Sequence, residues 1–295
     1  MKRSPKKYLA LALSLLMLGV WPVGCNSGGD TGLTGTIAIS GSSALYPLAR
    51  AAATQFKTDH ADVAIIVSAG GSGTGLNNVL TGTVDIGNSD VYAAEKLTPE
   101  YAERLVDHKV CVVGIAVIVN AGVGATVTDL STEQLQAIFS GSITNWSAVG
   151  GPNQAITIIN RPTSSGTRAL FVRWALAGQT NMEGDVSLQT DDSNALLSIV
   201  GTTPGAIGYL ALSYLREASS NVSMVSINGV AATYSNIYNN SYQIWGFEHM
   251  YTLGQPNALT QSYLDFVVSP AMAEQTEALG YGLVSRLDPA AAGSH

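Results

Sequence analysis

Short apolar runs alternate along the chain with stretches that have helical spacing. Runs such as 63–70 (VAIIVSAG) and 110–120 (VCVVGIAVIVN) are bounded by polar residues or glycine, which is typical of buried strands. The stretch 44–59 has helical spacing, and Pro47 lies near its first turn, where proline is tolerated. This alternation predicts an α/β fold with mainly parallel sheets. The strands expected are 35–40, 63–70, 84–89, 110–120 and 155–161, and the helices expected are 44–59, 73–82, 131–139 and 167–177.

The first 25 residues differ from this pattern and resemble an export signal. A basic segment, MKRSPKKY, precedes an apolar run that is short for a membrane span. The run ends at PVGC, which resembles a lipoprotein processing site, although such sites usually carry leucine where this chain has Pro22. We expect residues 1–25 to be a signal peptide and Cys25 to be lipidated; the alternative is an ordinary signal peptide with a stray cysteine. Residues 26–34 are then a flexible tether.

Composition limits the classes of function. The chain has 295 residues, enough for one or two domains, with 46% hydrophobic and 12% charged residues, which argues against disorder and nucleic-acid binding. The net charge of −7 means that an anionic ligand must be held by local geometry. Cys111 is expected to be a buried strand cysteine without a disulfide. The histidines lack metal-ligand spacing, so we expect no metal site. We also expect no cofactor.

Three turns that join a strand to a helix share one composition. They are SGSSALYP (40–47), AGGSGTG (69–75) and RPTSSGTR (161–168). The first N–H groups of a helix are unpaired and carry partial positive charge, hydroxyls add donors, and glycine allows close approach. A tetrahedral oxyanion suits such a site. Ordinary N-capping explains any one turn alone, but three turns together with Arg161 favour an anion site.

Two acids follow in DIGNSD, at Asp85 and Asp90. A carboxylate in an anion site is repulsive unless the anion carries a proton to share. Hydrogen phosphate has such a proton and sulfate at neutral pH has none. A carboxylate acceptor would therefore favour the binding of hydrogen phosphate over sulfate by a factor of roughly 10⁴–10⁵. We expect Asp85 to be a solvated or capping acid, whereas composition alone does not decide the role of Asp90.

Longer motifs resemble a known family. GSSALYPLA, GGSGTGLNNVLTGTVDIGNSD, DLSTEQLQAIFSGSITNWSAVGG, NRPTSSGTR and GAIGYLALSY occur in this order over most of the chain. They are similar to the PstS-type phosphate-binding proteins of phosphate ABC transporters, in the type II periplasmic-binding-protein superfamily. The resemblance implies two α/β lobes, 33–118 plus 245–288 and 119–244, with hinge strands near 117–120 and 242–246. It implies a binding protein, not an enzyme.

The resemblance also implies the ligand set. Asp90 would accept the phosphate proton, and Arg161 would pair with two phosphate oxygens. Arg168 would either pair with Asp90 or be a surface helix arginine, and the choice between Ser42 and Ser43 stays open. The segment SYQIWGFEHMYT departs from the family with Gly246 and Glu248 in a place that is often basic. The expected phosphate ligands are Ser42, Ser43, Ala44, Ser72, Asp90, Arg161, Ser165, Gly166 and Thr167.

The expected function is an exported, lipid-anchored, monomeric receptor, periplasmic or on the cell surface, that closes on one phosphate and delivers it to an ABC permease. The alternatives are a receptor for sulfate, molybdate or tungstate, a phosphate-ester hydrolase, and a surface or signalling protein on the same fold. The glycine-rich turn has Leu76 and Asn77 where a nucleotide-binding P-loop needs lysine and a hydroxyl residue, so nucleotide hydrolysis is not expected.

Overall fold

The computed structural model describes residues 32–179, 188–216 and 220–295. Residues Leu33–His295 form one compact unit. The expected signal peptide, the lipidation site Cys25 and most of the 26–34 tether lie outside the described residues.

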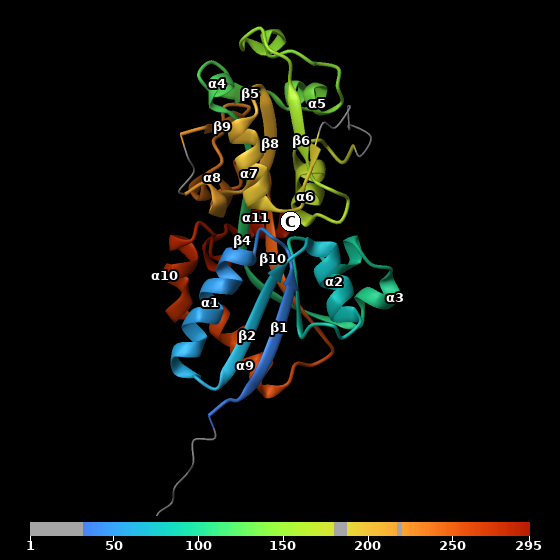
Figure 1. The fold of residues 1–295 in the computed structure, drawn as a ribbon, viewed down its shortest axis with the longest axis vertical. Coiled ribbons are helices and arrows are strands. Elements are labelled where there is room, and N and C mark those ends of the chain that lie inside the picture. The colour runs from blue at the N-terminus through green and yellow to red at the C-terminus, as the bar shows by residue number, and fades with distance from the viewer. Residues whose placement is uncertain (1–31, 180–187, 217–219) are drawn as a thin grey trace, which may run out of the picture. The chain divides into compact units, whose positions relative to one another are not determined.

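Strands are found where the apolar runs predict them. The described part of the chain contains one ten-stranded sheet with the order β2-β1-β3-β10-β4-β8-β6-β7, and β9 joins it by pairing with β4 and β5. Figure 1 shows β1 and β2 in one half of the ribbon and β6 and β8 in the other. The strands are β1 (Gly35–Gly41), β2 (Val63–Ala69), β3 (Ile86–Ser89), β4 (Leu105–Asn120), β5 (Asp129–Leu130), β6 (Thr157–Asn160), β7 (Leu188–Gln189), β8 (Ala206–Ala211), β9 (Val222–Ile227) and β10 (Trp245–Leu253).

Parallel pairing occupies both ends of the sheet and antiparallel pairing its centre. β1 pairs in parallel with β2 and β3, and β6 pairs in parallel with β7 and β8. The central strands β4 and β10 pair antiparallel with each other and with β8 and β3. Five of the nine strand pairings among the described residues are parallel. The α/β prediction is confirmed, and the antiparallel centre adds to it.

The long strand β4 connects the two ends of the sheet. Its first part, up to Gly114, pairs with β10, and its second part, from Ile115, pairs with β8. From Val110 to Val119 every residue of the strand is buried, as expected for a segment covered on both faces. A register irregularity occurs in the pairing of β10 with β4 between Glu248 and His249.

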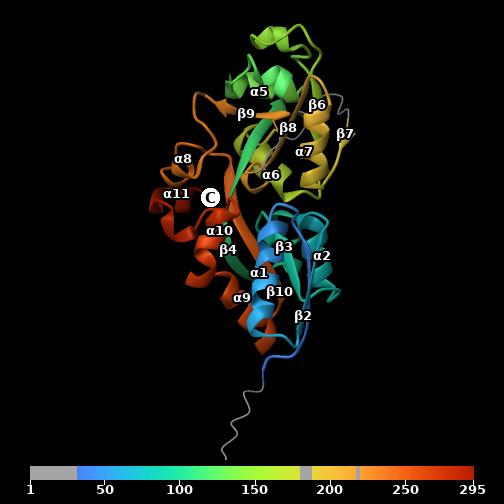
Figure 2. The same ribbon diagram turned by 60° about the vertical axis from the view of Figure 1, so that its left-hand side comes forward.

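Helices cover the sheet, and α5 begins with a capping box. Ser131 and Gln134 form a capping box at α5, because each side chain bonds the backbone N–H of the other residue. Helices α1 and α2 lie on opposite sides of β1 (Figures 1 and 2). The helices are α1 (Tyr46–Asp59), α2 (Ser72–Leu80), α3 (Pro99–Ala102), α4 (Ala121–Gly124), α5 (Thr132–Phe139), α6 (Gly166–Trp174), α7 (Ser193–Thr202), α8 (Tyr234–Tyr238), α9 (Ala258–Val267), α10 (Pro270–Ala278) and α11 (Pro289–Ser294).

The apolar core is divided between the two ends of the sheet. One cluster joins β1, β2, α1 and α9 around residues such as Ile39, Phe56 and Tyr263. Another surrounds the second part of β4 and includes Trp146, with the ring of Phe171 stacked on that of Tyr209 at 3.9 Å. Within the described ranges, no helix has the length and apolar character needed to cross a membrane.

Candidate anion-binding site

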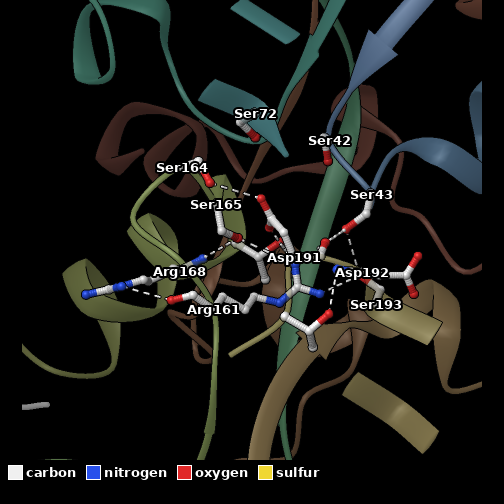
Figure 3. Close-up of polar contacts among 12 residues, drawn as sticks. Ser42, Ser43, Ser72, Arg161, Ser164, Ser165, Arg168, Asp191, Asp192 and Ser193 are labelled. Atoms are coloured by element: carbon white, nitrogen blue, oxygen red, sulfur yellow. Dashed lines mark hydrogen bonds and ion pairs between the residues drawn. The ribbon is translucent and has the colours of Figure 1, made fainter. Parts of the chain in front are cut away.

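The hydroxyl-rich turns predicted from the sequence come together in the structure. Ser43 lies between β1 and α1, Ser72 is the first residue of α2, and Ser165 caps the N-terminus of α6. All three side chains are at most 3% exposed, although they come from segments far apart in the chain. Figure 3 shows Ser43 and Ser165 near the Arg161 side chain, with Ser72 close by. The shared serine, threonine and glycine composition of these turns therefore identified residues that lie in one buried cluster.

Arg161 lies at the centre of this cluster. It follows β6 directly and is 1% exposed. Its Nη1 donates to the hydroxyls of Ser43, Ser165 and Thr167 at 3.5, 3.4 and 3.4 Å, and its Nη2 donates to Ser193 Oγ at 2.6 Å. The three Nη1 bonds are at the long limit for hydrogen bonds, and Nε has no partner among the described residues. Nη1 and Nε of this buried guanidinium therefore remain able to donate to an anion.

Asp90 is the buried acceptor of the cluster. It lies just after β3 and is 2% exposed. The Thr167 hydroxyl donates to Oδ2 at 2.6 Å, and the Ser72 hydroxyl donates to Oδ1 at 3.3 Å. The Asp90 N–H in turn donates to Ser72 Oγ at 3.0 Å. The Asp90 carboxylate thus belongs to the same group of hydroxyls as Arg161.

Gly166 allows the first turn of α6 to approach Ser72 and Asp90. A Cβ added at Gly166 would lie 2.2 Å from Ser72 Oγ and 2.9 Å from Asp90 Cβ. Any side chain at this position would therefore displace the serine and the acid. The first turn of α6 can face Asp90 only because this residue is glycine.

Asp191 and Ser193 also belong to the cluster, although neither was expected from the sequence. Asp191 Oδ1 lies 3.7 Å from Arg161 Nη1, and Ser164 Oγ donates to Asp191 Oδ2 at 3.2 Å. The Ser43 hydroxyl donates to the Asp191 carbonyl at 2.8 Å. Burial raises the pKa of Asp191, while the charge of Arg161 opposes the rise. The segment TDDSN, at the start of α7, also carries hydroxyl residues at the beginning of a helix, and that signal could have found it.

The remaining candidates have more local roles. Ser42 Oγ accepts from the Leu45 N–H at 3.1 Å, so it caps the turn before α1, and Ser43 is the serine that reaches Arg161. Ala44 is fully buried, and its carbonyl accepts from the Tyr281 hydroxyl at 2.5 Å. Asp85 is exposed and accepts from the Ala38 N–H in the middle of β1, in line with the expected solvated acid.

Of the two roles expected for Arg168, pairing with Asp90 or a surface position on the helix, the surface position is wrong. Arg168 is 8% exposed, so it is not a surface helix arginine. Its Nη1 donates to the Arg161 carbonyl at 2.8 Å, which links the first turn of α6 to the end of β6 (Figure 3). Arg168 therefore helps to fix the backbone that carries Arg161.

Lys96 adds a further positive charge beside the cluster. Its Nζ donates to the carbonyls of Thr163 and Ser165 at 2.7 and 3.1 Å. Burial lowers the pKa of Lys96, while the charge of Asp90 opposes this shift. The lysine thus holds the turn before α6 from the side of the chain that carries Asp90.

This geometry suits a small tetrahedral oxyanion. Arg161, the hydroxyls and the N-terminus of α6 supply donors and positive charge. Asp90 supplies an acceptor, which an oxyanion can satisfy only with a proton of its own. The chemistry of the cluster is therefore that of a binding site for a protonated oxyanion.

Comparisons with known proteins agree with this interpretation. Residues 26–271 match the model of the PBP superfamily domain. The chain is 47% identical over 241 residues to the phosphate-binding protein PstS of Bacillus subtilis, covering 82% of this chain and 78% of that protein. It is 27% identical over 243 residues to PstS of Staphylococcus aureus, covering 78% of this chain and 72% of that protein.

Solved structures show the same fold. A phosphate ABC transporter substrate-binding protein with bound phosphate from Clostridium perfringens has a TM-score of 0.77 and 29% identity, and the match covers 85% of this chain and 100% of that one. An ABC-type phosphate transport receptor from Vibrio cholerae has a TM-score of 0.66 and 25% identity, with coverage of 84% and 99%. The chain therefore belongs to the PstS-type family of phosphate-binding proteins, within the PBP superfamily.

Proposed function

We propose that this protein binds inorganic phosphate, as an ion that still carries hydrogen, and delivers it to an ABC permease for uptake. The observation that carries the proposal is the junction of Asp90 and Arg161 through Thr167 in one buried cluster. A guanidinium can pair with two oxygens of the anion, and the carboxylate can accept the hydrogen of a third. The nine residues named from the sequence form the proposed ligand set, with Ser43 rather than Ser42 as the principal hydroxyl of the first turn.

The site is completed by closure of two lobes, 33–118 plus 245–288 and 119–244. Several hydrogen bonds join these two parts of the chain around the cluster. Gly73 N–H donates to the Ser164 carbonyl at 2.9 Å, and the Tyr214 hydroxyl donates to the Ser43 carbonyl at 2.6 Å. These contacts and the burial of the cluster support the assignment of a closed form, and phosphate entry would require them to open about the crossings near 117–120 and 242–246.

The proposed site of action is outside the cytoplasm. Residues 1–25 act as an export signal, and Cys25 carries the lipid that tethers a monomeric receptor to a membrane. Support comes from the basic segment, the short apolar run and the PVGC sequence. A Cys25→Ser variant should leave the membrane fraction and appear in the soluble fraction, while keeping its affinity for phosphate.

Titration calorimetry with phosphate, and then with phosphate in a large excess of sulfate, tests the binding proposal. We expect phosphate binding that sulfate does not displace, because sulfate would place two anionic oxygens face to face at Asp90. Preference for sulfate, molybdate or tungstate would overturn the assignment to phosphate. Phosphate uptake by cells that lack the protein tests delivery separately.

A further inference from the structure

Glu248 is a buried carboxyl group that the proposed phosphate site does not use. It lies on β10 and is 0% exposed. Neither of its carboxyl oxygens has a hydrogen-bond partner among the described residues. An ionised carboxylate without partners is very costly to bury, so a group in this position keeps its proton instead. Burial raises the pKa of Glu248 well above its ordinary value, and Asp90 raises it further.

The sheet places Glu248 beside Asp90. His249 of β10 pairs with Ser89 of β3 in an antiparallel register, so the next positions along, Glu248 within β10 and Asp90 just after β3, lie opposite each other. Residues at such positions point to the same face of a sheet. Two carboxyl groups this close and this deeply buried do not both ionise.

The other titratable groups around Glu248 do not neutralise it. They are Cys111 on β4 and three tyrosines, Tyr214, Tyr234 and Tyr281, from three further segments. Burial raises the pKa of each of these groups, so all four are neutral at physiological pH. The tyrosine hydroxyls donate to the backbone carbonyls of Ser43, Gly280 and Ala44, respectively, and not to Glu248. Asp90 is therefore the charged group that Glu248 faces.

The hydrogen bonds decide which carboxyl group of the pair holds the proton. Asp90 accepts from two hydroxyls, those of Thr167 and Ser72, so each of its carboxyl oxygens already acts as an acceptor. Glu248 receives no hydrogen bond from the described residues. The pair therefore has Glu248 as its proton donor and Asp90 as its acceptor.

We propose that Glu248 is a positioning residue for the anion site, which keeps its proton and donates it in a hydrogen bond to the Asp90 carboxylate. This inference rests on the proposed phosphate binding. A carboxylate has about four acceptor positions. Ser72 and Thr167 occupy two, Glu248 occupies a third, and the fourth is left for the hydroxyl of the bound anion. A turn of the Glu248 carboxyl about its last torsion, which is a soft one, forms the bond.

The arrangement has a consequence for charge. With one proton on the pair, the site presents a single buried negative charge to the incoming anion. Loss of that proton would place a second negative charge beside Asp90, in a region of low dielectric where repulsion is strong. Glu248 thus sets the upper limit of the pH range in which the site accepts a phosphate dianion.

The test compares the wild-type protein with Glu248→Gln, which keeps a donor but cannot ionise, and with Glu248→Leu, which has no donor. The exposed Glu103→Gln is the matched control. Infrared spectra report the carbonyl band of a protonated carboxyl group, and calorimetry at each pH gives the ratio of phosphate dissociation constants between wild type and variant. The ratio cancels the titration of phosphate itself. Thermal unfolding shows whether the leucine variant is folded.

We expect the infrared band in the wild type at neutral pH, its loss in Glu248→Gln and its retention in Glu103→Gln. At neutral pH the glutamine variant should bind phosphate about as well as the wild type, whereas the leucine variant should bind about ten- to a hundredfold more weakly, as for a lost charge-assisted hydrogen bond. Where rising pH removes the band, wild-type binding should weaken relative to Glu248→Gln.

Three results would overturn the inference: no such band in the wild type, a band unchanged by Glu248→Gln, or loss of the band with pH at a constant affinity ratio. Full affinity in a folded leucine variant would also contradict it. Failure of the wild type to bind phosphate would refute the proposed function instead, and the infrared comparison would still report the state of Glu248.

Discussion

The Thr167 hydroxyl donates a hydrogen bond of 2.6 Å to Asp90 Oδ2. The same hydroxyl accepts a bond of 3.4 Å from Arg161 Nη1, so it lies between the acid and the guanidinium. A short bond to one side and a long bond to the other mean that Thr167 is polarised toward Asp90. An anion that carries a hydrogen can donate it to Asp90 in place of Thr167, and its other oxygens can accept hydrogen bonds from Arg161.

Asp90→Asn should weaken phosphate binding by at least about tenfold and reduce discrimination against sulfate much more. The amide has a single oxygen acceptor, no negative charge, and donors that suit an anion without hydrogen. Calorimetric titrations of the variant with phosphate and with sulfate measure both effects. Asp85→Asn is the control, because Asp85 is exposed and accepts from the backbone of Ala38. If Asp90→Asn kept the wild-type preference for phosphate over sulfate, Asp90 would not recognise the hydrogen of the ligand.

Arg161→Lys should weaken phosphate binding by about a hundredfold even though it keeps the charge. Lysine has a compact ammonium group in place of the planar fork, so it cannot pair with two oxygens at once, and it does not reach Ser193 and the α6 hydroxyls together. Calorimetry measures the loss. The control is Arg50→Lys, because Arg50 is exposed on α1. If Arg161→Lys bound phosphate as the wild type does, the fork would have no role in recognition.

Local composition was enough to predict the turns that form the site. Ser43, Ser72 and Ser165 lie where a strand ends and a helix begins, and such positions favour hydroxyls and glycine whether or not a ligand is present. The resemblance to a family added Asp90 and Arg161, which composition could not assign. The structure brings these five residues into one cluster.

Other features depend on contacts between distant segments and could not be predicted. Asp191 approaches Arg161 because β7 lies beside β6, a pairing that the sequence of β7 does not reveal. The antiparallel centre of the sheet was missed because a buried apolar run has the same pattern in either direction. Glu248 stood out in the sequence only as an unusual residue, since its burial beside Asp90 is set by the pairing of β10 with β3.

Gly166→Ala should weaken phosphate binding by at least about tenfold. The added Cβ would lie 2.2 Å from Ser72 Oγ, so the serine, Asp90 or the first turn of α6 must move. A displacement of this size at a binding site has large effects because hydrogen-bond strength falls steeply with geometry. Calorimetry measures affinity, and thermal unfolding measures the accompanying loss of stability. Gly293→Ala is the control, since a Cβ there meets nothing within 4 Å, and equal behaviour of the two variants would contradict the prediction.

His295 should make the stability of the protein fall at acidic pH. Its ring stacks between Trp174 of α6 and Trp245 of β10, at 3.9 and 3.7 Å, and its Nε2 donates to the Gln243 carbonyl. Burial lowers the pKa of His295 to about 4, and Arg173 adds to this shift. In the unfolded chain the pKa of histidine is about 6.5. Between these two values the unfolded state binds more protons, so the free energy of unfolding is highest above about pH 6.5 and decreases as the pH falls toward 4.

His295→Phe separates this effect from the titration of the carboxyl groups. Phenylalanine keeps a ring between the two tryptophans but cannot bind a proton. Denaturant unfolding at several values between pH 7 and pH 4 should show a steeper loss of stability in the wild type than in the variant, with the difference largest in the acidic part of the range. Parallel curves for the two proteins would mean that His295 becomes protonated in the folded state as easily as in the unfolded chain. In that case the tryptophan stack would not exclude water from the ring, and the contact between α6 and β10 would be open to solvent.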